Sequence, residues 1–242
     1  MKVGIITQAR MTSTRLPGKV MLTAAGRPLL DIHLDRLSAT DLPVIVATTT
    51  NAADDPIAGL AGSRGLTVFR GSEEDVLGRF AGAADEAGLD AVVRVTSDCP
   101  LLDPEVIGDA VRLFTELNDP DAYVSNVIER TYPRGLDVEV FSAAALADAD
   151  ASATDPSDRE HVTPYLYANR SGRTTLRSIT RTPDASRHRI TLDTADDLTV
   201  IRRLIEDHDA ARLDAAGLVA VLDAHPELTA INAHVEQKKL GG

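Results

Sequence analysis

The chain of 242 residues, 43% of them hydrophobic, suits one α/β domain over residues 1–242 and is too short for two ordinary domains. Its formal net charge of -12 at pH 7 disfavours broad nucleic-acid binding, because most of the surface would repel a phosphate backbone. No apolar run nears the roughly 20 residues that cross a bilayer and the single cysteine excludes an internal disulfide, so we expect a cytoplasmic protein with no nucleic-acid or membrane partner.

Strand and helix patterns alternate regularly through the first half of the chain. Residues 3–7 form a short apolar run typical of a buried parallel strand, and the helix that follows has Leu30, Leu34 and Leu37 on one face. Three similar units follow, with strands at residues 44–48, 66–69 and 91–96 and helices beginning near Asp54, Glu73 and Pro104. Repeated units of this kind predict an α/β fold, with a mostly parallel central sheet and helices on both faces.

The pattern changes after about Asp119. Residues 122–127 and 136–141 have the pattern of strands, and the short loop between them predicts an antiparallel or mixed pairing. Beyond them we expect a helix over residues 159–169, strands over 174–179 and 188–192, and helices over 196–206 and 215–224. The tail over residues 236–242 is predicted to be frayed and disordered.

A polar loop from Gln8 to Lys19 follows the first strand, so it opens at the carboxyl edge of the sheet, where ligands bind in open α/β folds. Between Met1 and Leu30 the chain has no acidic residue, which makes this loop locally cationic. Its basic side chains, hydroxyls and amides suit phosphate oxygens, although the loop is neither a P-loop nor a dinucleotide-binding motif. We predict a phosphate-binding loop. The alternative is a solvated connection in which basic residues cluster by chance.

Two aspartates are expected at neighbouring strand ends. Asp98 ends one hydrophobic strand, and Asp193 follows the strand predicted over residues 188–192. A carboxylate repels a triphosphate unless a divalent cation intervenes, and Mg²⁺ is held by one or two carboxylates together with phosphate oxygens. We therefore predict Mg²⁺ as the cofactor, with Asp98 and Asp193 as its protein ligands. The alternatives are that Asp98 only caps the turn before Pro100 and that Asp193 is structural.

Six motifs follow one another along the chain. They are QARMTSTRLPGK at residues 8–19, RGSEEDVLGRF at 70–80, RVTSDCPLLDP at 94–104, RGLDVEVF at 134–141, REHVTPYLY at 159–167 and LDTADDL at 192–198. In this combination the chain resembles the SpsF-like cytidylyltransferases over residues 1–206. These proteins are relatives of the enzymes that make CMP-activated 3-deoxy-manno-octulosonate and CMP-activated acylneuraminate.

The resemblance implies a Rossmann-like, GT-A-like nucleotidyltransferase fold. It also implies a small mixed β excursion, over residues 124–180, through which two copies form a homodimer. CTP is the nucleotide that the resemblance implies, with transfer of CMP to an acceptor and release of pyrophosphate. Asp98 and Asp193 match the family positions that bind Mg²⁺, and the first loop matches the one that binds the triphosphate.

These expectations assign roles to individual residues. Arg15, Lys19 and Asp98 are predicted to be catalytic. The residues predicted to contact the nucleotide are Gln8, Ala9, Arg10, Ser13, Thr14, Arg15, Lys19, Arg94, Thr96 and Asp98. Those predicted to contact the acceptor are Arg134, Asp137, Glu139, Arg159 and His161. For the acceptor set, the alternatives are a solvated strand face and a charge cluster at a helix start with a role in dimer contacts.

We expect a small anionic or sugar-like acceptor whose oxygen attacks the α-phosphorus of CTP in line. Catalysis of such a transfer comes mainly from positioning and charge neutralisation. One alternative is a nucleotidyltransferase that uses another triphosphate or a phosphonate or polyol phosphate acceptor. Another is a catalytically silent nucleotide-binding partner of a different enzyme.

Overall fold

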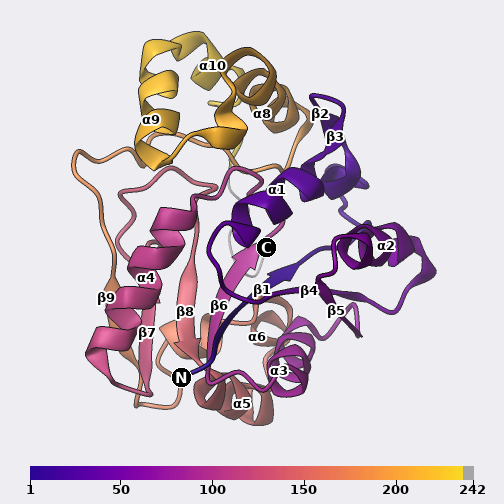
Figure 1. Cartoon of the computed structure of the whole chain (residues 1–242). Coiled ribbons are helices and arrows are strands. Elements are labelled where there is room, and N and C mark those ends of the chain that lie inside the picture. The colour runs from indigo at the N-terminus through magenta and orange to yellow at the C-terminus, as the bar shows by residue number, and fades with distance from the viewer. Residues whose placement is uncertain (237–242) are drawn as a thin grey trace.

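The structure is a computed structural model that describes residues 1–236 of the chain (Figure 1). Within them, seven strands form one sheet in the order β5-β4-β1-β6-β8-β7-β9, and two short strands form a hairpin. The sheet strands are β1 Val3–Gln8, β4 Val44–Thr49, β5 Thr67–Gly71, β6 Ala91–Thr96, β7 Ala122–Ser125, β8 Glu139–Ser142 and β9 Thr175–Ser178; the hairpin is β2 Thr23–Ala24 with β3 Arg27–Pro28. The tail predicted to be frayed lies outside the described residues, apart from Glu236.

The sheet has a parallel half and a mixed half. β1 lies between β4 and β6 in the parallel half, and β5 forms its edge. β8 runs antiparallel to both β6 and β7, and β9 pairs parallel with β7. The predictions of a mostly parallel sheet and of a mixed pairing in the second half of the chain are therefore confirmed.

The helices follow the strands as the alternating pattern predicts. They are α1 Leu29–Ser38, α2 Asp55–Ser63, α3 Val76–Glu86, α4 Pro104–Leu117, α5 Ala143–Ser152, α6 Pro156–His161, α7 Pro164–Tyr167, α8 Ala195–His208, α9 Ala215–Ala224 and α10 Pro226–Ile231, with 3-10 turns η1 Lys19–Met21, η2 Ala52–Asp54 and η3 Ala210–Arg212. The helix expected from Glu73 begins three residues later because Asp75 caps it, accepting a 3.0 Å hydrogen bond from the Gly78 amide. In the described part of the chain, no helix is long and apolar enough to cross a membrane.

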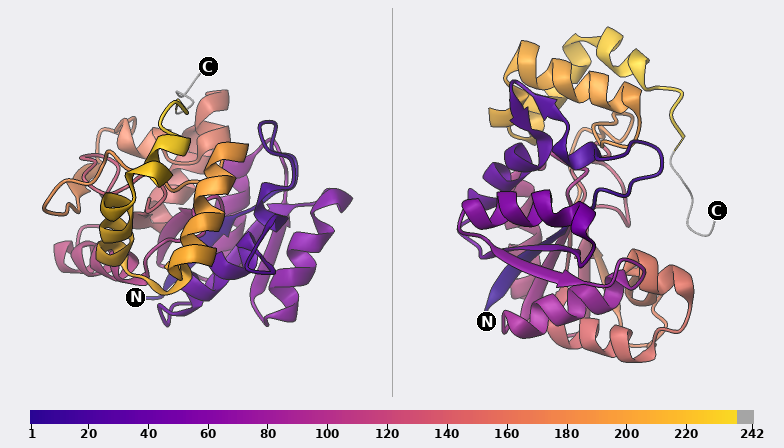
Figure 2. Two further views of the ribbon diagram at one scale, coloured as in Figure 1. Left: turned by 90° about the horizontal axis from the view of Figure 1, so that it is seen from above. Right: turned by 90° about the vertical axis from the view of Figure 1, so that its right-hand side faces the viewer.

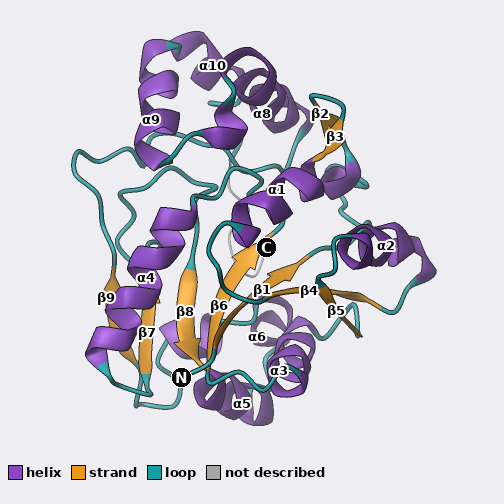
Figure 3. Ribbon diagram, in the orientation of Figure 1, coloured by secondary structure: helices purple, strands orange, loops and turns teal. Residues whose placement is uncertain are grey.

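Helices cover both faces of the sheet (Figure 3). Side chains alternate between the faces along each strand, so Ile5 belongs to the apolar core that includes α1, α2, α4, α8 and α9, while Ile6 belongs to the core that includes α3, α5 and α7. All six residues of β4 are buried, which explains its continuous apolar run. In the right-hand view of Figure 2, the gold helices α8–α10 and the salmon segment with α5 and α6 lie at opposite ends of the molecule.

The helix predicted over residues 159–169 is wrong. The structure has two short helices instead, α6 and α7, separated at Val162, whose φ of 72° and ψ of -55° leave the helical region. Pro164 is consistent with the interruption, because its nitrogen has no hydrogen to donate and could not continue the hydrogen-bond ladder of a helix that ran through it. The polypeptide turns at this point, and the turn separates the side chains of the REHVTPYLY motif.

The second half differs from the prediction at three further places, one of which is helix α10, which was not expected. Residues 188–192 form no strand of the sheet and contribute a single parallel bridge between Arg134 and Arg189. Helix α5 was not expected, because its alanine-rich segment shows little apolar periodicity; Leu146 and Ala149 are its buried residues. Its start has a local signal, since the Ser142 hydroxyl accepts a 3.0 Å hydrogen bond from the Ala145 amide.

Gly135 allows two segments that are distant in sequence to touch. Its φ is 108°, and a Cβ at this position would lie 2.6 Å from the carbonyl carbon of Ile190. The contact is fixed on both sides, as the Arg134 amide donates to His188 O at 3.0 Å and the Ile190 amide donates to Arg134 O at 2.7 Å. The segment that carries Arg134 is thereby placed beside the segment that leads to Asp193.

We expect Gly135→Ala to lower the free energy of unfolding by about 2 to 4 kcal/mol, because the added methyl group meets backbone atoms that cannot move aside. Urea denaturation of the two proteins measures the difference. Gly172→Ala is the matched control, since Gly172 also has a positive φ, of 75°, but no atom within 4 Å of its Cβ position. Equal losses in the two variants would contradict the proposed close contact.

Candidate active site

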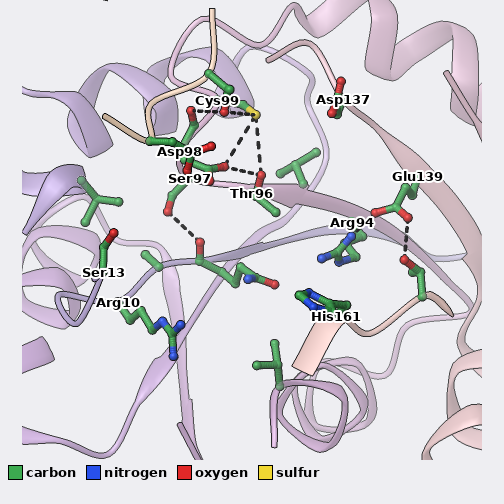
Figure 4. Close-up of a pocket in the computed structure, with 18 of the residues that line it drawn as sticks. Arg10, Ser13, Arg94, Thr96, Ser97, Asp98, Cys99, Asp137, Glu139 and His161 are labelled. Carbon is green, nitrogen blue, oxygen red and sulfur yellow. Dashed lines mark hydrogen bonds and ion pairs between the residues drawn. The ribbon is translucent and has the colours of Figure 1, made fainter. Parts of the chain in front are cut away.

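A pocket with a volume of about 540 Å³ opens at the carboxyl ends of β1 and β6. The chain continues from β1 towards β4 and β5 on one side and later returns to β6 on the other, so the pocket lies where open α/β sheets bind ligands. All but one of the residues predicted to form the site line this pocket: Gln8, Ala9, Arg10, Ser13, Thr14, Arg15, Lys19, Arg94, Thr96, Asp98, Arg134, Asp137, Glu139, His161 and Asp193. Figure 4 shows Arg10 and Ser13 on one side of the pocket and Asp137 and Glu139 on the other.

The loop after β1 is held in a closed shape. The Gly18 amide donates to Met11 O at 2.9 Å, and the Met11 amide donates to the buried carboxylate of Asp54 at 2.7 Å. Gly18 has a φ of 66° and precedes the 3-10 turn that begins at Lys19. This turn places the Lys19 side chain inside the pocket rather than in solvent.

Lys19 bridges the two aspartates that the sequence predicts as metal ligands. Its Nζ lies 2.9 Å from Asp98 Oδ2 and 2.9 Å from Asp193 Oδ1. Burial lowers the pKa of Lys19, but the charges of Asp98 and Asp193 outweigh it and raise the pKa above its ordinary value. Burial also raises the pKa of Asp98, yet the Lys19 charge and a 2.6 Å hydrogen bond from the Thr96 hydroxyl bring it down to about 2. Lys19 and Asp98 are therefore both charged at neutral pH.

Asp193 is surrounded by cations. Besides Lys19, Arg15 lies 3.2 Å and Arg189 3.1 Å from its Oδ2. Arg189 is oriented by Asp197, at 2.8 Å, and Asp197 forms the capping box of α8 with Thr194. The start of α8 thus fixes the position of Asp193 at the pocket.

The donor set fits a magnesium ion that is shared with a phosphate. Asp98 and Asp193 offer carboxylate oxygens to one and the same cation, the Lys19 ammonium. Within residues 1–236, no three His, Cys, Asp or Glu side chains lie close enough together to hold a metal ion alone. Two protein carboxylates, with the remaining ligands from substrate and water, are the arrangement that Mg²⁺ favours in phosphate chemistry.

A buried polar network forms the floor of the pocket. Arg94 pairs with Glu139, and its guanidinium carbon lies 5.7 Å from the centre of the Phe80 ring. Glu139, which is 8% exposed, also accepts hydrogen bonds from the Tyr123 hydroxyl and, at 2.7 Å, from the Thr163 hydroxyl. Because both carboxylate oxygens are already engaged, the geometry suits Glu139 to positioning Arg94 more than to contacting an acceptor.

Further arginines lie on the side of the pocket that carries the residues predicted to contact the acceptor. Arg130, which the sequence reasoning missed, pairs with Asp137 through two hydrogen bonds of 2.6 and 3.1 Å. Arg134 is partly buried, and no ion pair links it to another described side chain. Burial and the nearby charge of Arg130 lower the pKa of Arg134, as expected for a cation without a carboxylate of its own.

Arg159 is the predicted site residue that the structure places elsewhere. Its guanidinium pairs with Asp75 and with Asp150, at 2.7 Å, and it does not line the pocket. Arg159 therefore ties α3 to α5, which fits the alternative of a charge cluster at a helix start. Successive residues on a helix turn by about 100°, so Glu160 and His161 reach the pocket wall while Arg159 does not.

Arg79 is a second pocket residue that the sequence reasoning missed. It is 3% exposed, donates to Ser72 O at 2.6 Å, and has a buried Nε that finds no partner among the described residues. Burial and the charge of Arg10 lower its pKa. Its position next to Phe80, in the apolar stripe of α3, was a usable signal, because an arginine on the core side of a helix needs a polar partner there.

His33 supports the turn that carries Asp98. Its ring is fully buried, accepts a 2.9 Å hydrogen bond from the Thr7 hydroxyl, and donates through Nδ1 to Cys99 O at 3.0 Å. Burial lowers the pKa of His33 from 6.5 to about 4. The ring therefore stays neutral in the folded protein at pH values where it is protonated in the unfolded chain.

We expect this difference to make the protein less stable in mild acid. Between pH 6.5 and 4 the unfolded chain binds a proton at His33 that the folded chain does not bind. As the pH falls through this range, His33 therefore lowers the free energy of unfolding by about 1.4 kcal/mol per pH unit. In His33→Gln this contribution is lost, and stability should fall less steeply over the same range. Urea denaturation at pH 7, 6, 5 and 4 measures both slopes. The exposed His234→Gln is the control, and an unchanged slope in His33→Gln contradicts the prediction.

Relatives of known sequence match nearly the whole chain. A family model described as "Cytidylyltransferase" matches residues 4–222. An uncharacterized protein of Methanocaldococcus jannaschii is 36% identical, over 98% of this chain and 97% of the relative. The spore coat polysaccharide biosynthesis protein SpsF of Bacillus subtilis is 30% identical, over 92% of this chain and 94% of the relative.

Solved structures show the same architecture. A cytidylyltransferase from Leptospira borgpetersenii is 32% identical and superposes with a TM-score of 0.90 over 99% of both chains. CMP:2-keto-3-deoxy-manno-octonic acid synthetase complexed with CTP is 16% identical, with a TM-score of 0.62, over 86% of this chain and 99% of the other. The latter likeness concerns the fold alone. Together they confirm the predicted nucleotidyltransferase fold.

Proposed function

The chain belongs to the cytidylyltransferase family and is thus a nucleotidyltransferase, and we propose that it transfers CMP from CTP to a small anionic or sugar-like acceptor with release of pyrophosphate. The observation that carries the proposal is the meeting of Lys19 with Asp98 and Asp193 beside a loop rich in phosphate-binding groups. A triphosphate and a divalent cation are the ligands that such a mixture of charges suits.

In this proposal the loop after β1 holds the triphosphate. Arg15 and Lys19 bind the β and γ phosphates, and Ser13, Thr14 and the loop amides donate hydrogen bonds to phosphate oxygens. Asp98 and Asp193 hold Mg²⁺, which neutralises charge on the phosphates when it is bound. The base and ribose lie towards Gln8, Arg94 and Thr96, which line the same pocket.

The reaction is an in-line displacement at the α-phosphorus. An acceptor oxygen forms the new bond to phosphorus while the bond to the bridging oxygen of the β-phosphate breaks, and pyrophosphate leaves. The protein contributes by holding the two reactants in line and by balancing the charge of the leaving group with Lys19 and Arg15. Arg134, Asp137 and His161 are the residues proposed to orient the acceptor on the opposite wall.

The names of two relatives support the proposed activity and indicate a metabolic setting for it. SpsF carries the name of a spore coat polysaccharide biosynthesis protein, and one structural relative makes a CMP-activated sugar acid and was solved with CTP. From the family resemblance we propose a homodimer that forms through the excursion over residues 124–180, and from the composition a cytoplasmic location. The intact loop and both aspartates favour an active enzyme over a silent nucleotide-binding partner.

Release of pyrophosphate in the presence of Mg²⁺ tests the function directly. CTP, UTP, ATP and GTP are each combined with a panel of sugar acids, sugar phosphates and phosphonates. We expect CTP to exceed the other triphosphates by about tenfold or more, and only with a matching acceptor and Mg²⁺. Faster turnover with another triphosphate would replace CTP in the proposal. Binding of nucleotide without turnover on any acceptor would favour the silent partner.

We expect Lys19→Met to raise the KM for the triphosphate and to lower kcat, together by about a hundredfold in kcat/KM, because a charge that meets the leaving group is lost. Steady-state kinetics with CTP measure both constants. Lys2→Met is the matched control, since Lys2 is exposed and contacts Ala87 O, far from the pocket wall. Equal kinetics for Lys19→Met and the wild type would remove Lys19 from the mechanism.

A further inference from the structure

Lys19 lies between two carboxylates, a position that stabilises a cation. Its ammonium is within hydrogen-bond distance of both Asp98 and Asp193. The side chain of Lys19 is 14% exposed, that of Asp98 26% and that of Asp193 9%. Ion pairs that are this far removed from solvent are weakly screened, so the attraction is much stronger than at a surface. Any other cation that binds to these oxygens has to compete with the ammonium.

The charges around the two carboxylates already balance. Asp98 and Asp193 carry two negative charges, and Lys19 and Arg15 supply two positive ones. Arg189 does not change this sum, because Asp197 compensates its charge. A divalent metal ion that enters alone would add two positive charges beside three basic side chains, which is unfavourable at these distances.

A bound nucleoside triphosphate changes the balance of charge around the two carboxylates. Its phosphates are strongly anionic and offer the Lys19 ammonium a second set of partners, and the flexible stem of a lysine permits the exchange. Arg15, which is 39% exposed at its side chain, has the same freedom to move from Asp193 to a phosphate. The carboxylates are then available to a cation that is also bound by the triphosphate.

We propose that Lys19 competes with divalent metal for Asp98 and Asp193, so that the metal binds to this pocket together with nucleotide and only weakly without it. The proposal rests on the proposed function for the identity of the nucleotide. It gives Lys19 a role beyond contact with the triphosphate, since the same side chain sets the order in which the reactants bind.

Titration of Mn²⁺ into the protein, followed by calorimetry, tests the competition without any nucleotide. We expect Lys19→Met to bind Mn²⁺ more tightly than the wild type, on the order of tenfold or more. Lys2→Met is the charge-matched control and should behave like the wild type. Adding Asp98→Asn to Lys19→Met should abolish the gain, which assigns it to these carboxylates. Affinities for Mn²⁺ that agree within about twofold between Lys19→Met and the wild type would overturn the proposal.

The wild-type protein supplies a second test that needs no folded variant. Water-proton relaxation distinguishes Mn²⁺ bound to the protein from Mn²⁺ bound to CTP in solution. We expect CTP to strengthen the binding of Mn²⁺ to the wild-type protein, and equally tight binding with and without CTP contradicts the proposal. Absence of pyrophosphate release would contradict the proposed function instead, while the titration without nucleotide stays interpretable.

Discussion

Asp98→Asn is expected to lower the rate of pyrophosphate release by about a thousandfold, which corresponds to about 4 kcal/mol of transition-state stabilisation. The substitution keeps the size of the side chain but removes the negative charge that, in the proposed function, attracts a cation to the phosphates. The carboxylate is ionised throughout the neutral range, because the pKa of Asp98 is about 2. The variant therefore loses a charge that is fully present in the wild type.

A continuous assay of pyrophosphate release, at saturating CTP and Mg²⁺, measures this effect. Thermal unfolding shows whether the fold survives; we expect it to, because Lys19 keeps its contact with Asp193. Asp109→Asn is the matched control, since it removes an aspartate charge that pairs with Arg112 at the surface. If Asp98→Asn retains more than about a tenth of the wild-type rate, Asp98 does not hold the metal.

Glu139→Ala is expected to lower the free energy of unfolding by about 3 to 5 kcal/mol, the usual result of removing one partner from a buried ion pair. The Arg94 guanidinium would keep its charge in the floor of the pocket, with Phe80 as its remaining close contact. Two further donors, the hydroxyls of Tyr123 and Thr163, would lose their acceptor. Urea denaturation of the variant and the wild type measures the loss.

A double variant separates the stability of this network from its function. Arg94→Met combined with Glu139→Leu replaces the ion pair by apolar side chains of similar volume, which commonly restores stability. We expect the double variant to unfold near the wild-type urea concentration yet to bind CTP poorly, because Arg94 lines the pocket. A loss below about 1 kcal/mol in Glu139→Ala would show that water or another group compensates Arg94.

The parallel half of the fold was predictable because its signals are local. The inner strands there are short apolar runs that are largely buried, and a polar cap or a proline marks the start of the helix after β6. Asp103 and Pro104 at the start of α4 are an example. Such signals depend on neighbours within a few residues, so they can be recognised in the sequence without knowledge of the tertiary structure.

The mixed half was harder because its structure depends on distant contacts. The segment over residues 188–192 is largely buried and has the composition of a strand, but it forms a single bridge with Arg134. Its partner is decided by the approach of Gly135 to Ile190, which no local pattern reveals. The break between α6 and α7 did have a local signal, since Pro164 lay inside the predicted helix.

The residues of the candidate site also fall into those that local motifs predict and those whose partners depend on distant contacts. The loop after β1, Asp98 and Asp193 were expected at the carboxyl edge of the sheet, and the structure brings them together in one pocket. Arg130 and Arg159 were not predictable in the same way, because their partners are set by side-chain direction rather than by position in a motif. The two arginines therefore have different surroundings, one at the pocket and one between helices.

The spacing of Lys19 and Asp193, 174 positions apart, has a consequence for synthesis on the ribosome. A chain that leaves the ribosome from its N-terminus can assemble β1, β4, β5 and β6 while Asp193 is still untranslated. Asp193 takes its position only after Asp197 has emerged and α8 has begun to form. A nascent chain thus forms most of its parallel sheet before Asp98 and Asp193 can come together.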